Sequence, residues 1–180
     1  HIASVGFDLY CKLVEDMVKD IRGKKSDPRI ETELDLMVKG FIPKNYVPDL
    51  NQRLDFYRRM QVASEYDEGL AIASELEDRY GPHPESVAKL LALLEIRMLC
   101  QRIHISKIEL KHNDACLHLL PSTAINPQIL TSLFDERLSM QSEYKIKIRL
   151  DRKGWKTDLK LVKNYLQKLA HSLLPVEEEN

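Results

Sequence analysis

The spacing of the apolar residues changes near residue 104, and this change constrains the fold more than any other feature of the sequence. Before it, apolar residues recur at helical spacing, and after it they alternate with polar residues in short runs. The segment from Pro84 to Ile103 is apolar over most of its girth, which predicts a central helix. We therefore expect a single α+β domain over 1–180, with a mostly helical part over 1–104 packed with a small mixed or antiparallel sheet over 105–180.

The individual elements follow from the same two periods and from their end signals. Asp49 is a candidate N-cap, Pro127 a first-turn residue, and Gly81 followed by Pro82 a helix end. The expected helices span 7–22, 50–63, about 64–79, 84–103 and 126–138, with a last helix capped by Thr157. The expected strands span 31–42, 105–111, 115–120 and 144–150. The strand-to-strand steps include a hairpin, which favours α+β over a doubly wound parallel sheet.

The composition is that of an ordinary soluble protein, with 43% hydrophobic and 31% charged residues. No apolar run approaches the roughly 20 residues that a membrane-spanning helix needs, and the first residues lack the form of a signal peptide. Cys11, Cys100 and Cys116 include no close pair, which excludes a disulfide framework. We expect a cytoplasmic protein without membrane contact, and a chain that begins with His1 is expected to be a fragment or a processed product.

No recognisable catalytic apparatus is present in the sequence. Phosphate-binding loops need clustered glycines, and no two of the six glycines lie within ten residues of each other. No Ser-His-Asp or Cys-His arrangement stands out either. We therefore expect no catalytic residues and no cofactor in this chain, and hence not an enzyme in its own right.

A zinc site is the least favoured of three candidate sites. Cys100, His104, His112, Cys116 and His118 fall within 19 positions, and all are ligand types for zinc. They include no CxxC, HxxxH or HExxH spacing. Isolated histidines and buried cysteines explain them better, so the prediction is no metal, with zinc at Cys100, His104 and Cys116 kept as an alternative.

An acidic helix end is the second candidate. Glu75 and Asp78 lie three residues apart on one helical face, and Arg79 follows Glu75 at the spacing of an intrahelical ion pair. From the residues alone, a solvated helix end explains this pattern better than a catalytic pair does.

A basic segment, KIKIRLDRKGWK over 145–156, is the third candidate. On a strand, Lys145, Lys147 and Arg149 would form a row suited to phosphates, and Trp155 could stack on a base. The whole-chain net charge of −1 weakens this reading, and the charged outer face of a sheet is the plainer explanation.

Four ordered phrases together carry a family resemblance. They are VGFDLYCKLVEDMV, ETELDL, IPKNYVPDLNQRLDFYRRM and ELEDRYGPHPESVAKLL. With these spacings the chain resembles the C-terminal domain of the bacterial transcription-repair coupling factors (Mfd). The resemblance covers at least residues 1–105, and beyond them only the order of elements is similar.

The resemblance implies a parent that is an ATP-driven DNA translocase acting in transcription-coupled nucleotide-excision repair. Such a parent binds duplex DNA, displaces stalled RNA polymerase and recruits UvrA, and its ATP-binding motor lies upstream of this domain. The resemblance also implies that this domain is regulatory: it docks on an N-terminal module similar to UvrB and masks the surface that binds UvrA. The alternative is an accessory domain that contacts nucleic acid.

The docking residues implied by the resemblance belong to an E-x-x-D-R motif. Its matching positions here are Glu75, Asp78 and Arg79, with Tyr80 as the aromatic that follows. These four residues are therefore the predicted interdomain docking site. Arg53, Tyr57 and Arg58 of the preceding helix are predicted, from helical adjacency, to border it.

Overall fold

The computed structural model describes residues 30–123 and 127–171, without the side chains of 127–129. The helix predicted over 7–22 and Cys11 lie outside the described residues. The described residues form two compact units, of which the first is made of 38–98 and the second of 30–37 together with the described part of 99–171. None of the described helices combines the length and the apolar character needed to cross a membrane.

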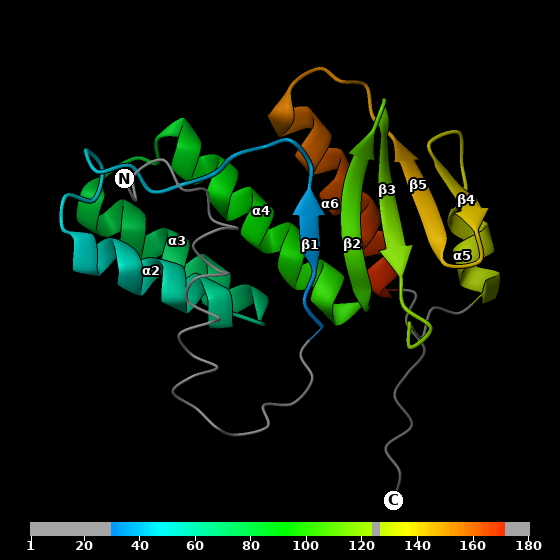
Figure 1. The fold of residues 1–180 in the computed structure, drawn as a ribbon, viewed down its shortest axis with the longest axis horizontal. Helices are drawn as coiled ribbons and strands as arrows, with labels where there is room; N and C mark the ends of the chain where they lie inside the picture. The colour runs from blue at the N-terminus through cyan, green and yellow to red at the C-terminus, as the bar shows by residue number, and fades with distance from the viewer. Residues whose placement is uncertain (1–29, 124–126, 172–180) are drawn as a thin grey trace, which may run out of the picture. The chain divides into compact units, whose positions relative to one another are not determined.

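The first unit is built from helices (Figure 1). Helix α2 spans Leu50–Val62, α3 spans Tyr66–Tyr80, and α4 spans Glu85–Arg102, with its last turn in the second unit. The Asp49 side chain accepts a hydrogen bond from the backbone N–H of Gln52 at 2.8 Å and caps α2, as the sequence predicts. All three helices occupy nearly the ranges expected from the helical spacing.

The core of the first unit forms where its helices meet. Its fully buried side chains include Phe56, Met60, Leu76, Leu90 and Leu94. The loop before α2 packs closely on α4 at Gly40, where an added Cβ would lie 2.3 Å from the backbone nitrogen of Leu90. Only glycine allows this approach, because backbone atoms cannot move aside as a flexible side chain can.

The second unit contains a five-stranded mixed sheet in the order β1-β2-β3-β5-β4. Strand β1 pairs with β2 in parallel, and every other neighbouring pair is antiparallel. The strands are β1 Glu33–Asp35, β2 Ile105–Lys111, β3 Asp114–Leu119, β4 Leu138–Ser142 and β5 Lys145–Arg149. Two helices complete this unit: α5 Pro127–Leu133 and α6 Trp155–His171. The predicted α+β class with a small mixed sheet is confirmed.

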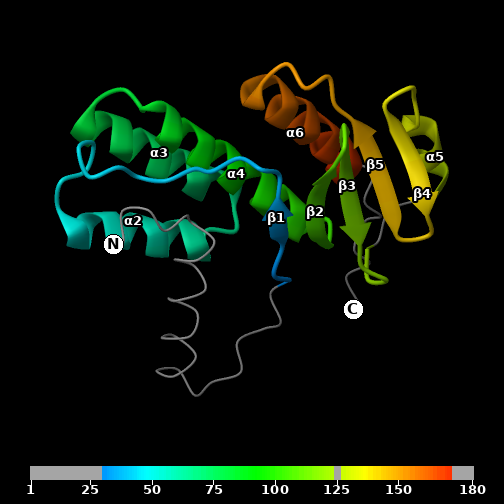
Figure 2. The ribbon, with the colours of Figure 1, turned by 45° about the horizontal axis from the view of Figure 1, so that its top comes forward.

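The two faces of this sheet differ in chemistry. Buried Ile108, Leu117 and Ile146 point to one face, which α6 covers in both ribbon views (Figures 1 and 2). The apolar stripe of α6 includes Leu159 and Val162, which are buried. Glu109, Lys145 and Lys147 alternate with the buried residues of β2 and β5 and point to the other face, as the period of two requires.

Three sequence expectations are corrected by the structure. The strand expected over 31–42 is only Glu33–Asp35, because Met37 adopts a left-handed backbone with φ 55° and turns the chain away from the sheet. The helix expected to reach Leu138 ends at Leu133, and Leu138 instead begins β4, where it pairs with β5. Thr157 does not cap the last helix, since α6 already begins at Trp155.

Candidate functional site

The four predicted docking residues occupy the C-terminal turns of α3. The helix ends at Gly81, whose φ of 84° suits glycine, and the Gly81 N–H donates to the carbonyl of Glu77 at 2.8 Å. Pro82 has no N–H with which to continue the helix. Asp78 and Arg79, in the last turn before this abrupt end, are exposed, whereas Leu76 of the same helix is buried in the core.

Glu75 is held between two arginines from different helices. Its Oε1 lies 2.7 Å from Nη1 of Arg79, four residues on, and its Oε2 lies 2.6 Å from Nη1 of Arg59 on α2. These hydrogen bonds, first from Arg59 and then from Arg79, hold the pKa of Glu75 below its ordinary value. About a third of the Glu75 side chain is exposed, so this Arg59–Glu75–Arg79 network is a surface network rather than a buried one.

Aromatic rings support the two guanidinium groups. The guanidinium carbons of Arg59 and Arg79 lie 5.4 and 5.7 Å from the centroid of the Phe56 ring, which is within cation–π range. Arg79 also lies 5.1 Å from the ring centroid of Tyr80. Phe56 is 1% exposed and meets Tyr80 edge-on, with their centroids 6.2 Å apart. The rings therefore form a rigid apolar base that restricts where the guanidiniums can lie.

Tyr80 is part of that base rather than a free surface ring. It packs against the core of the first unit, its hydroxyl donates to the side-chain oxygen of Gln52, and its ring lies 5.8 Å from that of Tyr46. The Tyr46 hydroxyl is directed at the carbonyls of Leu76 and Gly81, at 3.0 and 2.7 Å. Tyr80 is thus fixed on two sides and only partly available to another surface.

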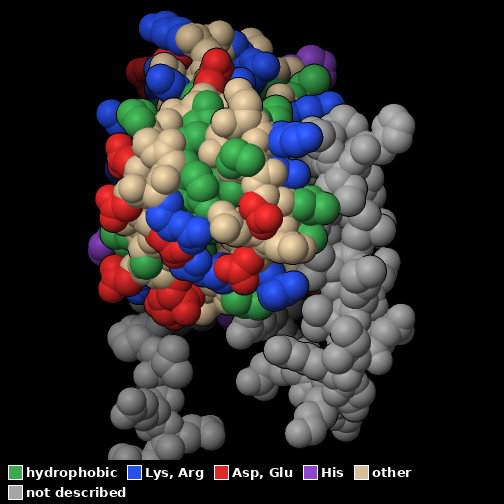
Figure 3. Space-filling model, turned by 90° about the vertical axis from the view of Figure 1, so that its left-hand side faces the viewer, with side chains coloured by type: hydrophobic (Ala, Val, Ile, Leu, Met, Phe, Trp, Pro, Cys, Tyr) green, Lys and Arg blue, Asp and Glu red, His purple; other side chains and the backbone are tan. Residues whose placement is uncertain are grey.

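Asp78 differs from its three neighbours in the motif. It is exposed, and among residues 30–123 and 127–171 it has no hydrogen-bond or ion-pair partner. The view from the α2–α3 side shows acidic and basic side chains directly beside one another on this face (Figure 3). The structure therefore brings the unpaired carboxylate of Asp78 together with a preorganised pair of guanidiniums at the end of α3, where the exposed carboxylate of Glu77 is likewise unpaired among the described residues.

The predicted nucleic-acid residues of β5 lie on the charged face of the sheet, where carboxylates accompany them. Lys145 lies 3.4 Å from Glu109, while Lys147 and Arg149 lie 3.7 and 3.8 Å from Asp114. These distances join each ammonium or guanidinium nitrogen to a carboxylate oxygen. The row of cations predicted from the sequence is present, but the neighbouring strands supply opposite charges to it.

Glu109 is the centre of this charged face. Its carboxylate also lies 2.7 Å from Nζ of Lys111 and 2.8 Å from Nε2 of His118. Hydrogen bonds from Lys111 and His118, in that order, lower the pKa of Glu109 to about 2. The carboxylate is therefore ionised at any physiological pH and offsets part of the positive charge around it.

A family model described as the TRCF domain matches residues 36–130, which is more than half of the chain. The chain belongs to the TRCF domain family. The matched range contains α2, α3 and α4, so the Arg59–Glu75–Arg79 network and Asp78 lie in the family segment.

The chain is similar to a short part of much longer proteins. The transcription-repair-coupling factor of Myxococcus xanthus is 42% identical over 99 residues, covering 54% of this chain and 8% of that protein. The protein of the same name from Escherichia coli K12 is 26% identical over 180 residues, covering 95% of this chain and 16% of that protein. The chain thus spans less than a fifth of the length of these relatives.

A solved structure shares the fold of this TRCF domain. The crystal structure of a C-terminal domain of transcription-repair coupling factor superposes with a TM-score of 0.72 at 17% identity. The match covers 79% of this chain and 94% of that chain. The resemblance identified from the four sequence phrases is confirmed: the chain belongs to the TRCF domain family, is similar in sequence to transcription-repair-coupling factors, and has the fold of the C-terminal domain of one of them.

The residues predicted to border the docking site have other roles in the TRCF domain. Arg53 donates to the carbonyls of Val47 and Pro48 at 2.6 and 2.9 Å and so holds the loop before α2. Tyr57 is 8% exposed and its hydroxyl accepts from the Ile42 N–H, so its placement at the surface was wrong. Arg58 is exposed and lies 3.9 Å from Asp55 of its own helix.

Arg59 was missed by the sequence reasoning. Nothing in the sequence relates it to Glu75, which lies 16 positions further on in another helix. The one available signal was its spacing of three from Phe56, which puts the two residues on the same face of α2. That spacing predicts a neighbour of the core but no partner.

The structure does not assemble the alternative zinc site. Among the described residues no three His, Cys, Asp or Glu side chains are placed to hold a metal ion. Cys100 is fully buried, which raises the pKa of its thiol, and the His104 ring lies 3.1 Å from the Ser122 hydroxyl.

Trp155, the aromatic residue of the nucleic-acid prediction, begins α6, the helix on the apolar side of the sheet. Its ring lies 5.7 Å from Nζ of Lys156.

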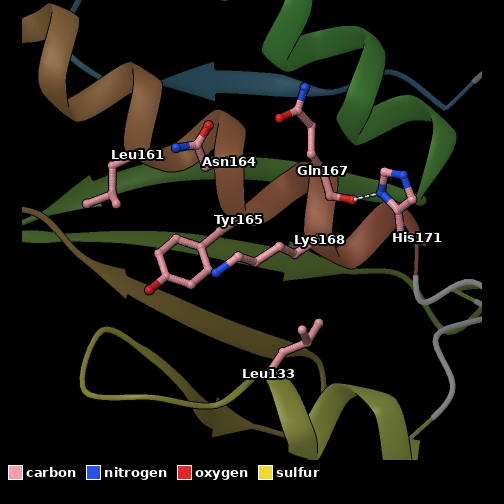
Figure 4. A pocket seen from close by; sticks show the side chains of 7 residues that line it. All are labelled: Leu133, Leu161, Asn164, Tyr165, Gln167, Lys168 and His171. Carbon is pink, nitrogen blue, oxygen red and sulfur yellow. Dashed lines mark hydrogen bonds between the residues drawn. The ribbon is translucent and has the colours of Figure 1, made fainter.

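An open groove of about 650 Å³ lies between α5 and α6 (Figure 4). Leu133 points into it from α5, and Tyr165 and Lys168 line it from α6, with Nζ of Lys168 4.8 Å from the Tyr165 ring centroid. The Tyr165 hydroxyl donates to Asp135 at 2.6 Å, and burial together with this carboxylate raises the pKa of Tyr165 to about 12. The phenol is thus held protonated as a hydrogen-bond donor, and the described residues that line the groove include no nucleophile paired with a base.

Proposed function

We propose that this chain is the regulatory docking domain of a transcription-repair coupling factor. It packs against the N-terminal UvrB-like module of its parent and masks the surface that binds UvrA. In this way it restrains an ATP-driven DNA translocase that meets RNA polymerase, duplex DNA and UvrA during transcription-coupled DNA repair. The single observation that supports docking most directly is the unpaired carboxylate of Asp78 beside the preorganised Arg59–Glu75–Arg79 network.

The physical character of this surface suits a contact that must form and release. An exposed ion pair contributes about 0.2–1 kcal/mol, because water screens it and two side chains lose freedom. Several such pairs at a rim set orientation and association rate more than affinity. Because the two guanidiniums are already held in place, their side chains lose less conformational entropy when the partner binds. A docked state held by these contacts would therefore be specific and still reversible.

The direct test measures association of the 180-residue chain with the separately produced N-terminal UvrB-like module of its own parent, at several salt concentrations. We expect binding that weakens as salt rises, because the proposed contacts are charged. Asp78→Asn should weaken it by about 1.4- to fivefold, as the loss of one exposed pair implies. Asp67→Asn is the matched control, since Asp67 is exposed in the first turn of the same helix.

The full-length protein provides the second readout. Replacing Glu75, Asp78 and Arg79 together by alanine should expose the masked surface and increase UvrA binding. Unchanged UvrA binding by this triple variant, or no association of the two parts even at low salt, would refute the docking function.

The alternative function, a nucleic-acid contact through Lys145, Lys147, Arg149 and Trp155, has weaker support. Glu109 and Asp114 already oppose the three cations of β5, so the field available to phosphates is reduced. A titration of duplex-DNA binding against salt separates the two functions, because phosphate contacts produce a steep slope. Weak binding without such a slope would exclude this alternative.

A further inference from the structure

Both carboxylate oxygens of Glu75 are already occupied by cations of its own unit. Oε1 meets Arg79 and Oε2 meets Arg59, at 2.7 and 2.6 Å. A partner cation that approached Glu75 would have to displace one of these arginines. Asp78 has no such internal competitor among the described residues. The three charged residues of the motif are therefore not equivalent, although the sequence pattern treats them alike.

Arg59 determines which charged residues of the E-x-x-D-R motif face outward. Arg59 and Arg79 are like charges that lie over the same Phe56 ring, and such a pair repels unless an anion lies between them. The Glu75 carboxylate is that anion. Without Arg59, Glu75 and Arg79 would be an ordinary exposed pair at helical spacing, which is weak and loosely defined.

We propose that Arg59 is a positioning residue of the docking site. Arg59 holds Glu75, and Glu75 in turn keeps Arg79 over the rings of Phe56 and Tyr80. Arg79 and Asp78 are then the residues that contact the partner. Arg59 and Glu75 form the inner part of the site, and Asp78 and Arg79 form the outer part. This inference rests on the proposed docking function, and it assigns to docking a residue that lies outside the E-x-x-D-R motif.

A purely structural role is the competing explanation. Arg59 and Glu75 join α2 to α3, so removing either residue could lower stability without touching the docking surface. The two explanations differ in how a folded Arg59 variant binds, because a purely structural role lowers stability without weakening binding by the folded chain. Lysine can keep the charge opposite Glu75, but it lacks the planar fork that both binds a carboxylate and stacks on a ring. A positioning role therefore predicts partial recovery of binding by lysine.

The experiment compares binding of the UvrB-like module to the 180-residue chain and to its variants Arg59→Gln, Arg59→Lys, Glu75→Gln and the Arg59→Gln/Glu75→Gln double variant. We expect Arg59→Gln to raise Kd about three- to tenfold and Arg59→Lys to recover part of this loss. The double variant should bind no worse than Glu75→Gln alone, because the two residues act as one unit. Arg58→Gln is the matched control: Arg58 is the residue before Arg59 on α2, lies 3.9 Å from Asp55 and is outside the Arg59–Glu75–Arg79 network.

Each outcome separates the inference from the function on which it rests. If Arg59→Gln binds like the unchanged chain while Asp78→Asn binds less well, the positioning role is wrong and docking stands. The positioning role is equally wrong if Arg58→Gln weakens binding as much as Arg59→Gln, or if the effects of Arg59→Gln and Glu75→Gln simply add. If the unchanged chain does not associate at all, docking is wrong and the positioning role falls with it. Circular dichroism at the assay temperature verifies that each variant is folded.

Discussion

Replacing Phe56 by leucine tests whether the ring beneath the two guanidiniums stabilises the first unit. The side chain is 1% exposed, so the exchange keeps an apolar group in the core and by itself costs less than about 1.5 kcal/mol. The contacts specific to the ring are lost in addition. Two guanidiniums over the ring contribute about 0.5–1 kcal/mol each at such partly exposed sites, and the edge-on contact with Tyr80 contributes about 0.5–1.5 kcal/mol.

These contacts amount to a loss of about 1.5–3.5 kcal/mol in the free energy of unfolding of the first unit. Hydrogen exchange of the backbone amides of α2 and α3 is a suitable assay, because it reports the opening free energy of one part of a chain. A double-mutant cycle then isolates the stacked guanidinium: Phe56→Leu combined with Arg59→Gln should show a coupling of about 0.5–1 kcal/mol. The same cycle with Arg58→Gln should show none, since Arg58 is not over the ring.

Two results would refute this reasoning. One is a Phe56→Leu variant whose opening free energy lies within about 0.5 kcal/mol of that of the unchanged chain, which is the range of ordinary surface substitutions. The other is equal coupling of Phe56 to Arg58 and to Arg59. Either result would mean that the ring fills space but does not hold the guanidiniums.

Three further predictions concern stability. Gly40→Ala should destabilise the first unit by at least about 1–3 kcal/mol in urea unfolding, because the Cβ of the alanine would meet the Leu90 backbone nitrogen at 2.3 Å and overpack the contact. A variant as stable as the unchanged chain would show that the loop can move away from α4. The pKa of Glu109 is lowered from 4.5 to about 2, so the stability that this carboxylate contributes is complete above about pH 4.5 and is lost as pH falls towards 2. In thermal unfolding over that pH range, the Glu109→Gln variant should therefore lose less stability than the unchanged chain. Equal losses would contradict the assignment. Tyr165→Phe should lower the free energy of unfolding by about 0.5–1.5 kcal/mol, because one hydrogen bond is lost. It should also raise the pKa of Asp135 in an NMR titration, because the tyrosine hydroxyl is the largest cause of the lowered pKa of that carboxylate. An unchanged pKa of Asp135 would show that this hydrogen bond is absent in solution.

Several elements were predictable because their signals are local. The Asp49 cap, the stop at Gly81 and the uninterrupted helical spacing over α4 depend on a few neighbouring residues, and the structure reproduces all three. The strict alternation from Tyr144 to Leu150 likewise predicted β5. Such features are decided by backbone geometry within one or two turns, so a single sequence contains them.

Elements that depend on a distant partner were harder to predict. Leu138 continues the helical spacing of Leu130 and Phe134, yet it belongs to β4 because pairing with β5 outweighs a weak local preference. The short strand β1 pairs with β2, more than 70 residues further along the chain, and so joins the second unit. No local pattern contains that information.

The candidate site shows the same division. The sequence by itself determined the α+β class, most helix bounds and the position of the E-x-x-D-R pattern on a helix end, because these follow from periodicity and from ordered phrases along one chain. The tertiary structure alone decided that Glu75 is occupied by Arg59, that Asp78 is the acid of the E-x-x-D-R motif left unpaired among the described residues, and that Glu109 and Asp114 oppose the cations of β5. The reason is physical: the charge that a side chain presents to a partner depends on the groups within a few ångströms of it, and folding brings those groups from distant positions in the sequence.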